Sequence, residues 1–319
     1  MKASVVIPAK NGGELLIKVV EQVLVQRAPW PFEVLVIDSG SSDGSIETLQ
    51  KFPITVHTIP SHEFGHGKTR NLGASLTCGE FIVFLTHDAL PAHERWLAAL
   101  IEAAEISPDT GGAFGPHLPY PDASPMLRRE LTQHFRGFGD EPSIVRNEDP
   151  DRYSQEEGYR QFLHFFSSNN ACLRRSVWAQ IPLRDVDFAE DQMWAKDMIE
   201  AGYAKAYAPE AEVFHSHNFG ITESLQRAFD ESRALNRLFG YILSPGLSHV
   251  LTQSMSLTQR DWQWVNEDVA DMGNRLLWRI RAPLLNLARL SGHYLGARQA
   301  SLPEWLVETL SRDKHLFRS

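Results

Sequence analysis

Residues 33–45 read Glu-Val-Leu-Val-Ile-Asp-Ser-Gly-Ser-Ser-Asp-Gly-Ser, an apolar run that ends at an acidic residue and a loop of small residues. Similar apolar runs, rich in Val, Ile and Phe, occupy residues 3–7, 54–59 and 81–85. Segments with helical periodicity separate them, at residues 14–25, 45–51 and 68–76. This alternation predicts βαβ crossovers and a mostly parallel sheet with flanking helices. Such a sheet binds ligands beyond the carboxyl ends of its strands.

The rest of the chain divides into three stretches of different character. Two more helices are expected at 94–107 and 126–138, and the polar, non-periodic residues 139–160 are expected to form a long loop. Residues 162–217 return to α/β character, and the pattern beyond Asn218 is helical. We therefore expect an α/β domain at 1–218 and a helical C-terminal region at 219–319.

Composition narrows the class of protein. The net charge of −9 argues against a nucleic-acid binder, which would need clustered Lys and Arg. No apolar run reaches the eighteen or so residues of a membrane span, and the N-terminus has no signal-peptide layout, so a cytoplasmic protein is expected. Cys78 and Cys172 have no metal-type spacing and lie in apolar segments, which favours buried, reduced thiols.

The loops after the predicted strands carry polar side chains. Asp38 ends the second strand, and an acidic residue beside small residues can form a hydrogen bond to a nucleoside. For Asp43, a ligand contact and a cap of the following helix are equally favoured. Lys68 and Arg70 open a helix after two glycines, which suits a diphosphate, although a bare basic helix start is the alternative. Asp88 follows the fourth strand and is a natural ligand for a hard divalent ion.

Two later motifs each allow two interpretations. Glu190 and Asp191 open a helix, where they either complement the helix dipole or supply the general base that deprotonates an attacking hydroxyl. His215 and His217 are two residues apart on an extended segment, so only one of them is expected to face the site as a metal ligand. A hydrogen-bonded or solvated imidazole is the alternative for either.

Taken in order, these motifs resemble the family 2 glycosyltransferases of GT-A fold, over residues 3 to about 218. The resemblance rests on Val5–Asn11, Val36–Ser45, Arg70–Gly73 and the Glu190-Asp191-x-x-Trp194 segment. It implies Asp191 as the base, with Glu190 as its substitute. The residues expected to contact the nucleotide-sugar donor are Pro8, Ala9, Asn11, Asp38, Ser39, Lys68, Arg70, Asn71, His87 and Asp88.

A narrower resemblance is to bacterial rhamnosyltransferases, carried by residues 63–71, 86–91 and 215–218. It implies dTDP-L-rhamnose as donor and a lipid-linked surface glycan, such as O-antigen, as acceptor. The wider family usually presents Asp-x-Asp, whereas Thr86 takes the first place here. We therefore expect Mg²⁺ or Mn²⁺ to be held loosely by Asp88 and His215 or His217, and to arrive with the nucleotide.

The expected reaction is a metal-assisted single displacement that inverts the anomeric configuration. Three alternatives are a UDP-sugar-dependent family 2 transferase, a non-catalytic glycan-binding relative, and a nucleotide-dependent oxidoreductase. A non-catalytic relative would lose the base or the metal ligand, and both are present. The oxidoreductase would need Gly-x-Gly-x-x-Gly after the first strand, which residues 8–13 do not supply.

Residues 275–298 carry five arginines and no acidic residue, interleaved with leucines and Trp278. A basic, apolar helix of this kind predicts peripheral binding to anionic lipid, with a kink or break at Pro283. The alternative is that the leucines pack on the catalytic domain, with the arginines solvated or paired.

Overall fold

The computed structural model describes residues 1–312 and contains two compact units. The first comprises Met1–Tyr120 and His134–His215, and the second comprises Pro121–Gln133 and the chain from Ser216 onward. The second unit therefore includes a short segment from the middle of the chain. The functional division at 218/219 stays a prediction.

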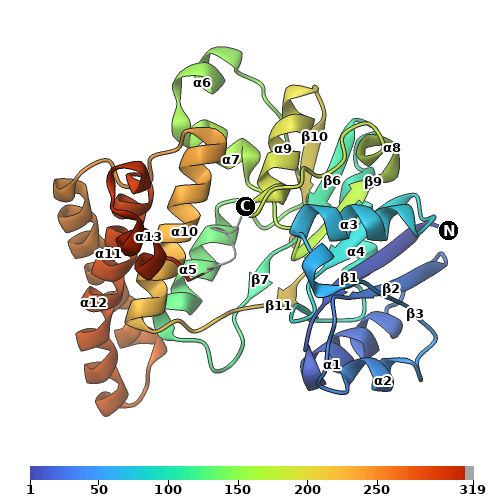
Figure 1. Ribbon diagram of the computed structural model, residues 1–319, viewed down its shortest axis with the longest axis horizontal. Helices are drawn as coiled ribbons and strands as arrows, with labels where there is room; N and C mark the ends of the chain where they lie inside the picture. The colour runs from blue at the N-terminus through green and yellow to red at the C-terminus, as the bar shows by residue number, and fades with distance from the viewer. Residues whose placement is uncertain (313–319) are drawn as a thin grey trace. The chain divides into compact units, whose positions relative to one another are not determined.

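An eight-stranded sheet forms the centre of the first unit, in the order β3-β2-β1-β4-β9-β6-β10-β8 (Figure 1). Its strands are β1 (Ala3–Ala9), β2 (Phe32–Asp38), β3 (Thr55–Thr58), β4 (Phe81–Leu85), β6 (Thr110–Phe114), β8 (Ser143–Val145), β9 (Asn170–Arg174) and β10 (Ala204–Tyr207). The first four strands are parallel to one another where they pair, as predicted. Strand β9 runs antiparallel to both β4 and β6, and β8 runs antiparallel to β10.

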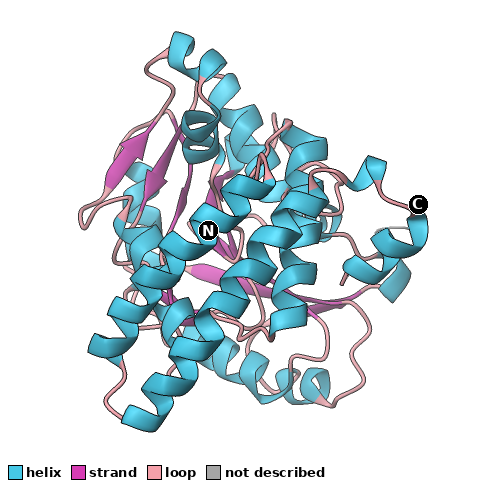
Figure 2. Ribbon diagram, turned by 90° about the vertical axis from the view of Figure 1, so that its left-hand side faces the viewer, coloured by secondary structure: helices cyan, strands magenta, loops and turns pink. Residues whose placement is uncertain are grey.

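Helices cover both faces of this sheet, which is why β1 is buried at every position from Ala3 to Ile7 (Figures 1 and 2). Alternate residues of β1 pack in the core cluster with α1 and α4, whereas Val6 faces Gly73 of α3 on the other side. The helices of this unit are α1 (Gly13–Leu24), α2 (Ser45–Leu49), η1 (Ser61–Glu63), α3 (His66–Ser75), α4 (Trp96–Glu105), α6 (Pro150–Gln155), α7 (Glu157–His164), α8 (Arg175–Trp178) and α9 (Glu190–Glu200).

A small second sheet gathers three loops of the first unit. Strand β11 (Val213–Phe214) lies between β5 (Leu90–Pro91) and β7 (His117–Leu118). It pairs antiparallel with β5 and parallel with β7. The chain segments that follow β4, β6 and β10 of the main sheet are thereby held together.

Two sequence expectations are wrong. The segment 139–160, expected to be a loop, contains β8, α6 and the start of α7. Asp149 caps α6 by accepting a hydrogen bond from the Arg152 N–H at 2.9 Å. Elements this short show no periodicity in the sequence, which is why they were not predicted. Cys78 is exposed because it lies in the turn before β4. Cys172 is buried within β9, where burial raises the pKa of its thiol to about 12. Both thiols are free, as expected.

The second unit is helical, and residues 219–312 contain no strand, as predicted. It contains most of α5 (Pro125–Arg136), together with α10 (Ile221–Phe239), α11 (Leu247–Asp268), α12 (Met272–Gly296), η2 (Gln299–Ser301) and α13 (Glu304–Leu310). Pro283 lies inside α12 without dividing it. Within residues 1–312, no helix combines the length and apolarity needed to cross a membrane.

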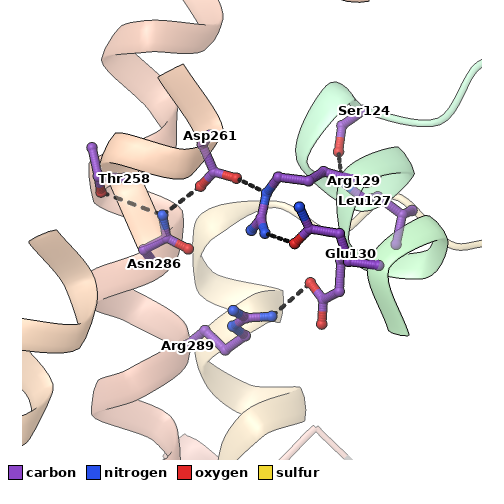
Figure 3. Close-up of polar contacts among 9 residues, drawn as sticks. Ser124, Leu127, Arg129, Glu130, Thr258, Asp261, Asn286 and Arg289 are labelled. Carbon is purple, nitrogen blue, oxygen red and sulfur yellow. Dashed lines mark hydrogen bonds and ion pairs between the residues drawn. The ribbon is translucent and has the colours of Figure 1, made fainter. Parts of the chain in front are cut away.

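A buried polar network connects three helices of this unit (Figure 3). The Arg129 guanidinium of α5 donates to Asp261 of α11 at 2.7 Å, and the Asn286 amide of α12 donates to the other oxygen of that carboxylate at 2.6 Å. The Arg129 and Asp261 side chains are both buried, so each charge is compensated by the other.

Candidate active site

The loops after β1 and β2 interlock at the carboxyl edge of the sheet. The buried Asp38 carboxylate accepts hydrogen bonds from the N–H groups of Gly40 (3.2 Å) and Ser41 (3.0 Å). Asn11 lies opposite with a left-handed φ of 48°, and its side chain accepts from the Ser42 N–H at 2.8 Å. The Ser39 hydroxyl donates to the carbonyl of Ala9 at 3.1 Å. Asp38, Ser39, Ala9 and Asn11 are thus brought together, and Pro8 precedes them at the end of β1.

Asp43 is not the cap of α2 that its sequence position suggested, because Gly44 is the N-cap, but Asp43 bonds the first residue of that helix. One carboxylate oxygen accepts from the N–H and the hydroxyl of Ser45, and the other accepts from the Gly13 N–H at 2.8 Å. These hydrogen bonds lower the pKa of Asp43, first of all the bond from the Ser45 hydroxyl. Asp43 therefore joins the loop after β1 to the start of α2.

The two cations of α3 have different environments. Lys68, in its first turn, is exposed to solvent. The Arg70 guanidinium is 4% exposed and donates to the Glu190 carboxylate at 2.6 Å, in a buried ion pair. A guanidinium held in this way is not placed to meet a diphosphate directly. The structure favours Lys68 for that contact and gives Arg70 the task of holding Glu190.

Asn71, expected to contact the donor, uses its amide within the protein. Its nitrogen donates to the Leu183 carbonyl at 2.7 Å, and its oxygen accepts from the Leu183 N–H and the Trp178 indole. This arrangement ties α3 to the segment between α8 and α9. It indicates a structural role for Asn71.

The small sheet brings Asp88 and His215 together. Asp88 precedes β5, His215 follows β11, and a His215 ring nitrogen lies 3.6 Å from an Asp88 carboxylate oxygen. Both side chains are half-buried. His87 is also half-buried, and lies beside Gly12 of the first loop. His217 is exposed and falls just past the boundary of the second unit.

His117 is a member of this site that the sequence analysis missed. Its ring centroid lies 5.0 Å from that of His215, and its ring nitrogen is 3.5 Å from the Ser167 hydroxyl. Burial, followed by the neighbouring His215, holds the pKa of His117 well below its usual range, so the imidazole is neutral. The only sequence signal was a histidine closely following the apolar stretch that forms β6.

Asp191 lies in the first turn of α9, after Ala189 in the left-handed region at φ 55°. Its carboxylate accepts from the N–H groups of Ser168 (2.9 Å) and Gln192 (2.8 Å). Burial and the adjacent Glu190 charge raise the pKa of Asp191 to about 6. A carboxylate with this pKa is ionised at neutral pH and basic enough to accept a proton.

The Asp191 and Asp88 loops are adjacent through the end of β4. The Thr86 N–H, just after β4, donates to the Asn169 carbonyl at 3.3 Å. Asn169 follows Ser168, whose N–H donates to Asp191. The hydroxyls of Thr86 and Ser168 are buried and have no hydrogen-bond partner among the described residues. Unpartnered polar atoms in the two loops that carry Asp88 and Asp191 fit a site for a polar ligand such as phosphate oxygens.

The sheet is mostly parallel, and an acidic residue, Asp38, ends β2. Asp88 follows β4 and lies beside His215, and the pKa of Asp191 in the adjacent loop is raised. These features together are those of a transferase of GT-A fold. Residues 4–179 match the model of the family described as Glycosyl transferase family 2, and the chain belongs to this family. It is a glycosyltransferase.

The comparisons with curated proteins identify full-length relatives. The O-antigen chain rhamnosyltransferase RfbN of Salmonella typhimurium is 32% identical over 315 residues, which cover 95% of this chain and 92% of the relative. The O-antigen chain rhamnosyltransferase WbaN of Salmonella anatum is 30% identical over 312 residues, covering 94% and 90%. The likeness extends through the helical unit as well as the sheet.

Solved structures share the fold at low identity. The mannosyltransferase PcManGT from Pyrobaculum calidifontis, in complex with GDP-Man and Mn²⁺, aligns with a TM-score of 0.60 and 15% identity, covering 94% of this chain and 88% of that one. TarS 1-349 of S. aureus, in complex with UDP-GlcNAc, aligns with a TM-score of 0.52 and 18% identity, covering 94% and 92%. These neighbours support the GT-A fold.

Proposed function

We propose that this glycosyltransferase moves L-rhamnose from dTDP-L-rhamnose to a hydroxyl of a growing surface glycan such as O-antigen, with inversion at the anomeric carbon. The donor and acceptor are inferred from the two Salmonella relatives, which are rhamnosyltransferases of the O-antigen chain and match this sequence almost from end to end. The proposal that Asp191 is the general base is supported above all by its raised pKa.

The nucleotide is proposed to lie across the loops after β1 and β2. Asp38 faces the nucleoside, and the ordered backbone of the Asn11 and Ser41 loops lets it approach closely. The exposed Lys68 at the start of α3 provides positive charge for the diphosphate. Arg70 acts indirectly, because its pairing with Glu190 fixes the start of α9.

The proposed metal ligands are Asp88 and His215, with His217 as the alternative imidazole. A carboxylate oxygen and an imidazole nitrogen would suit Mg²⁺ or Mn²⁺ as ligands. When bound, the ion neutralises charge on the departing diphosphate. His117 packs against His215 and limits the orientations of that ring.

Asp191 accepts the proton of the acceptor hydroxyl as its oxygen bonds to the anomeric carbon. The bond from that carbon to the β-phosphate oxygen breaks, and its electron pair leaves with dTDP. Attack opposite to the leaving group inverts the configuration. The N–H groups of Ser168 and Gln192 orient the Asp191 carboxylate for the transfer. Glu190, committed to Arg70, is the substitute base only if Asp191 is out of reach.

The site of action is proposed to be the cytoplasm, at the inner face of the cell membrane, where a lipid-linked acceptor is extended. Other glycan-assembly enzymes would then act on the same acceptor before and after this one. No nucleic-acid partner is proposed, since the net charge is −9.

The test is the release of nucleoside diphosphate from dTDP-L-rhamnose, UDP-glucose, UDP-GlcNAc and GDP-mannose, with and without EDTA. We expect dTDP-L-rhamnose to turn over fastest and EDTA to stop the reaction. Preference for a UDP-sugar would overturn the rhamnose assignment and leave the mechanism in place. Donor binding without turnover, for every donor and with acceptor glycan present, would favour a glycan-binding relative.

A further inference from the structure

Helix α12 of the second unit exposes a continuous apolar stripe. Its members are Met272 (79% exposed), Leu276 (63%), Ile280 (58%), Leu284 (48%) and Leu287 (42%). Spacings of four, four, four and three residues place them on one side of the helix. The opposite side is buried against the unit through residues such as Ala282, Asn286 and Gly292. Exposed apolar residues in a row, rather than scattered singly, mark a binding surface.

Arginines border this stripe. At 100° per residue, Arg279 lies on one flank and Arg281 on the other. Arg279 stacks over the Trp262 ring at 5.4 Å, and Arg281 stacks over the Trp278 ring at 4.9 Å. Trp278 itself is half-buried and lies away from the stripe. Residues 272–303 contain no Asp or Glu, in a chain whose net charge is −9.

The charge decides between possible occupants. A second copy docked face to face would bring the Arg279 and Arg281 groups of both copies together around a shared apolar contact, and like charges so placed repel. An anionic bilayer complements both features, because alkyl side chains enter the acyl boundary while arginines remain at the level of the phosphates.

We propose that the exposed side of α12 binds the surface of an anionic lipid bilayer, with the helix parallel to the membrane and the Met272–Leu287 stripe inserted. The helix lies on the bilayer rather than across it, which agrees with the absence of a membrane-spanning helix within residues 1–312. The inference deepens the proposed site of action, because it names the surface that contacts the membrane, and it holds whatever donor the enzyme uses.

Co-sedimentation of the full chain with vesicles tests the proposal. Vesicles of phosphatidylglycerol and phosphatidylcholine should bind the protein at low salt, and vesicles of phosphatidylcholine alone should not. High salt should weaken binding, since it screens the arginines. Each arginine near an anionic surface changes partitioning about fivefold, so Arg279→Glu/Arg281→Glu should lower it at least about 25-fold.

A second variant tests insertion separately from charge. Leu276→Ser/Ile280→Ser/Leu284→Ser removes apolar side chains that are already exposed, so the fold should persist. The matched controls lie in the first unit: Arg27→Glu/Arg95→Glu for charge, and Val25→Ser/Leu76→Ser/Ile106→Ser for exposed apolar residues. Both controls should bind vesicles like the parent.

Loss of vesicle binding in both α12 variants, with binding kept in both controls and donor turnover unchanged in all four, supports the proposal. It is overturned by no sedimentation with phosphatidylglycerol vesicles at low salt, or by equal losses in the controls. A third result also overturns it: the parent protein is a dimer that does not bind vesicles, and the triple serine variant is a monomer. Failure of donor turnover in the parent bears on the proposed function alone.

Discussion

At the scale of single residues, the two neighbouring carboxylates of α9 are distinguished by their partners. Glu190 is paired with a guanidinium, whereas Asp191 accepts only neutral N–H groups and feels the Glu190 charge. Asp191→Asn keeps the shape but cannot accept a proton, so the transfer rate should fall by roughly 10²–10⁴ while the donor KM stays close to the parent value. Glu190→Gln should retain far more activity. The reverse order of the two variants would make Glu190 the base.

The same pair sets the pH dependence. The base works when ionised, so kcat/KM should be level at neutral pH and fall as pH decreases through about 6, approaching tenfold per pH unit. Because the Glu190 charge raises the pKa of Asp191, Glu190→Gln should move this limb to lower pH. A limb that stays in place in Glu190→Gln would show that another group controls it.

The metal ligands can be separated in the same way. Asp88→Asn and His215→Ala should each weaken Mn²⁺ binding in the presence of dTDP by at least about tenfold, because each removes a ligand atom from an ion held by few. Titration calorimetry measures this without turnover. His217→Ala is the matched control and should bind the ion normally. Weakened binding in His217→Ala but not in His215→Ala would exchange the roles of the two histidines.

The sequence could nominate several candidate site residues because their chemistry follows from a place at a strand or helix end. Asp38, Asp88 and Asp191 are of this kind, and their positions follow from the parallel β1–β4 pattern or from a helix start. The sequence could not show that Arg70 pairs with a residue 120 positions away, since that depends on how α3 packs beside α9. His117 was missed for the same reason, because β7 pairs only with the distant β11.

At the scale of elements, Asn71 joins α3 to the segment before α9. Asn71→Ala leaves the Leu183 carbonyl and the Trp178 indole without this partner, so the free energy of unfolding should fall by about 1–3 kcal/mol. The donor KM should change little if the amide is structural. Chemical denaturation and donor kinetics on the same variant decide this. A large rise in KM at unchanged stability would return Asn71 to the donor site.

Helices α10 and α12 pack closely because α12 carries glycine at the contact. A Cβ at Gly292 would lie 2.3 Å from the Leu225 carbonyl oxygen, and one at Gly296 equally close to that of Phe229. Gly292→Ala should therefore destabilise the second unit by about 1–3 kcal/mol, as overpacking does. Gly273→Ala, near the start of the same helix, is the control and should change stability by less than about 1 kcal/mol. If both variants stabilise the protein to the same extent, helix propensity rather than packing dominates at Gly292 and the overpacking prediction is wrong.

Element prediction failed where elements are short. The bounds predicted for β1–β4 and for helices α1, α3, α4 and α5 agree with the structure within about two residues. The segment 143–164 holds β8, α6 and α7, of three, six and eight residues, and these are fixed by a cap and by pairing with β10 rather than by periodicity. Local pattern cannot reveal an antiparallel strand added at a sheet edge.

At the scale of the whole molecule, the alternation of strands and helices over the first ninety residues was enough to predict a mostly parallel sheet with flanking helices. The GT-A class followed from the resemblance of the ordered motifs to family 2 glycosyltransferases. The alternation was not enough to place β9, which comes from residues 170–174 and runs against β4 and β6. Nor could it show that Pro121–Gln133 leaves the first unit for the helical one. This segment contributes the Arg129 ion pair with Asp261, a contact between residues 132 positions apart that local pattern does not reveal.

The division into two compact units predicts how ligands and packing defects act on stability. Each unit has its own buried centre, the sheet core in one and the α10–α11–α12 helices with their polar network in the other. Nucleotide and metal are proposed to bind at the sheet. At concentrations of about 100 times Kd, they should therefore raise the free energy of opening of first-unit peptides by roughly 2.7 kcal/mol, as measured by hydrogen exchange under mild denaturant. Gly292→Ala should accelerate exchange in second-unit peptides and leave that ligand protection intact.

Measuring peptides from β1, β4 and α9 against peptides from α10 and α12, with and without dTDP and Mn²⁺, separates the two effects. If the ligands protect both sets equally and Gly292→Ala exposes both equally, the chain unfolds as one cooperative body and the two-unit description fails for its energetics.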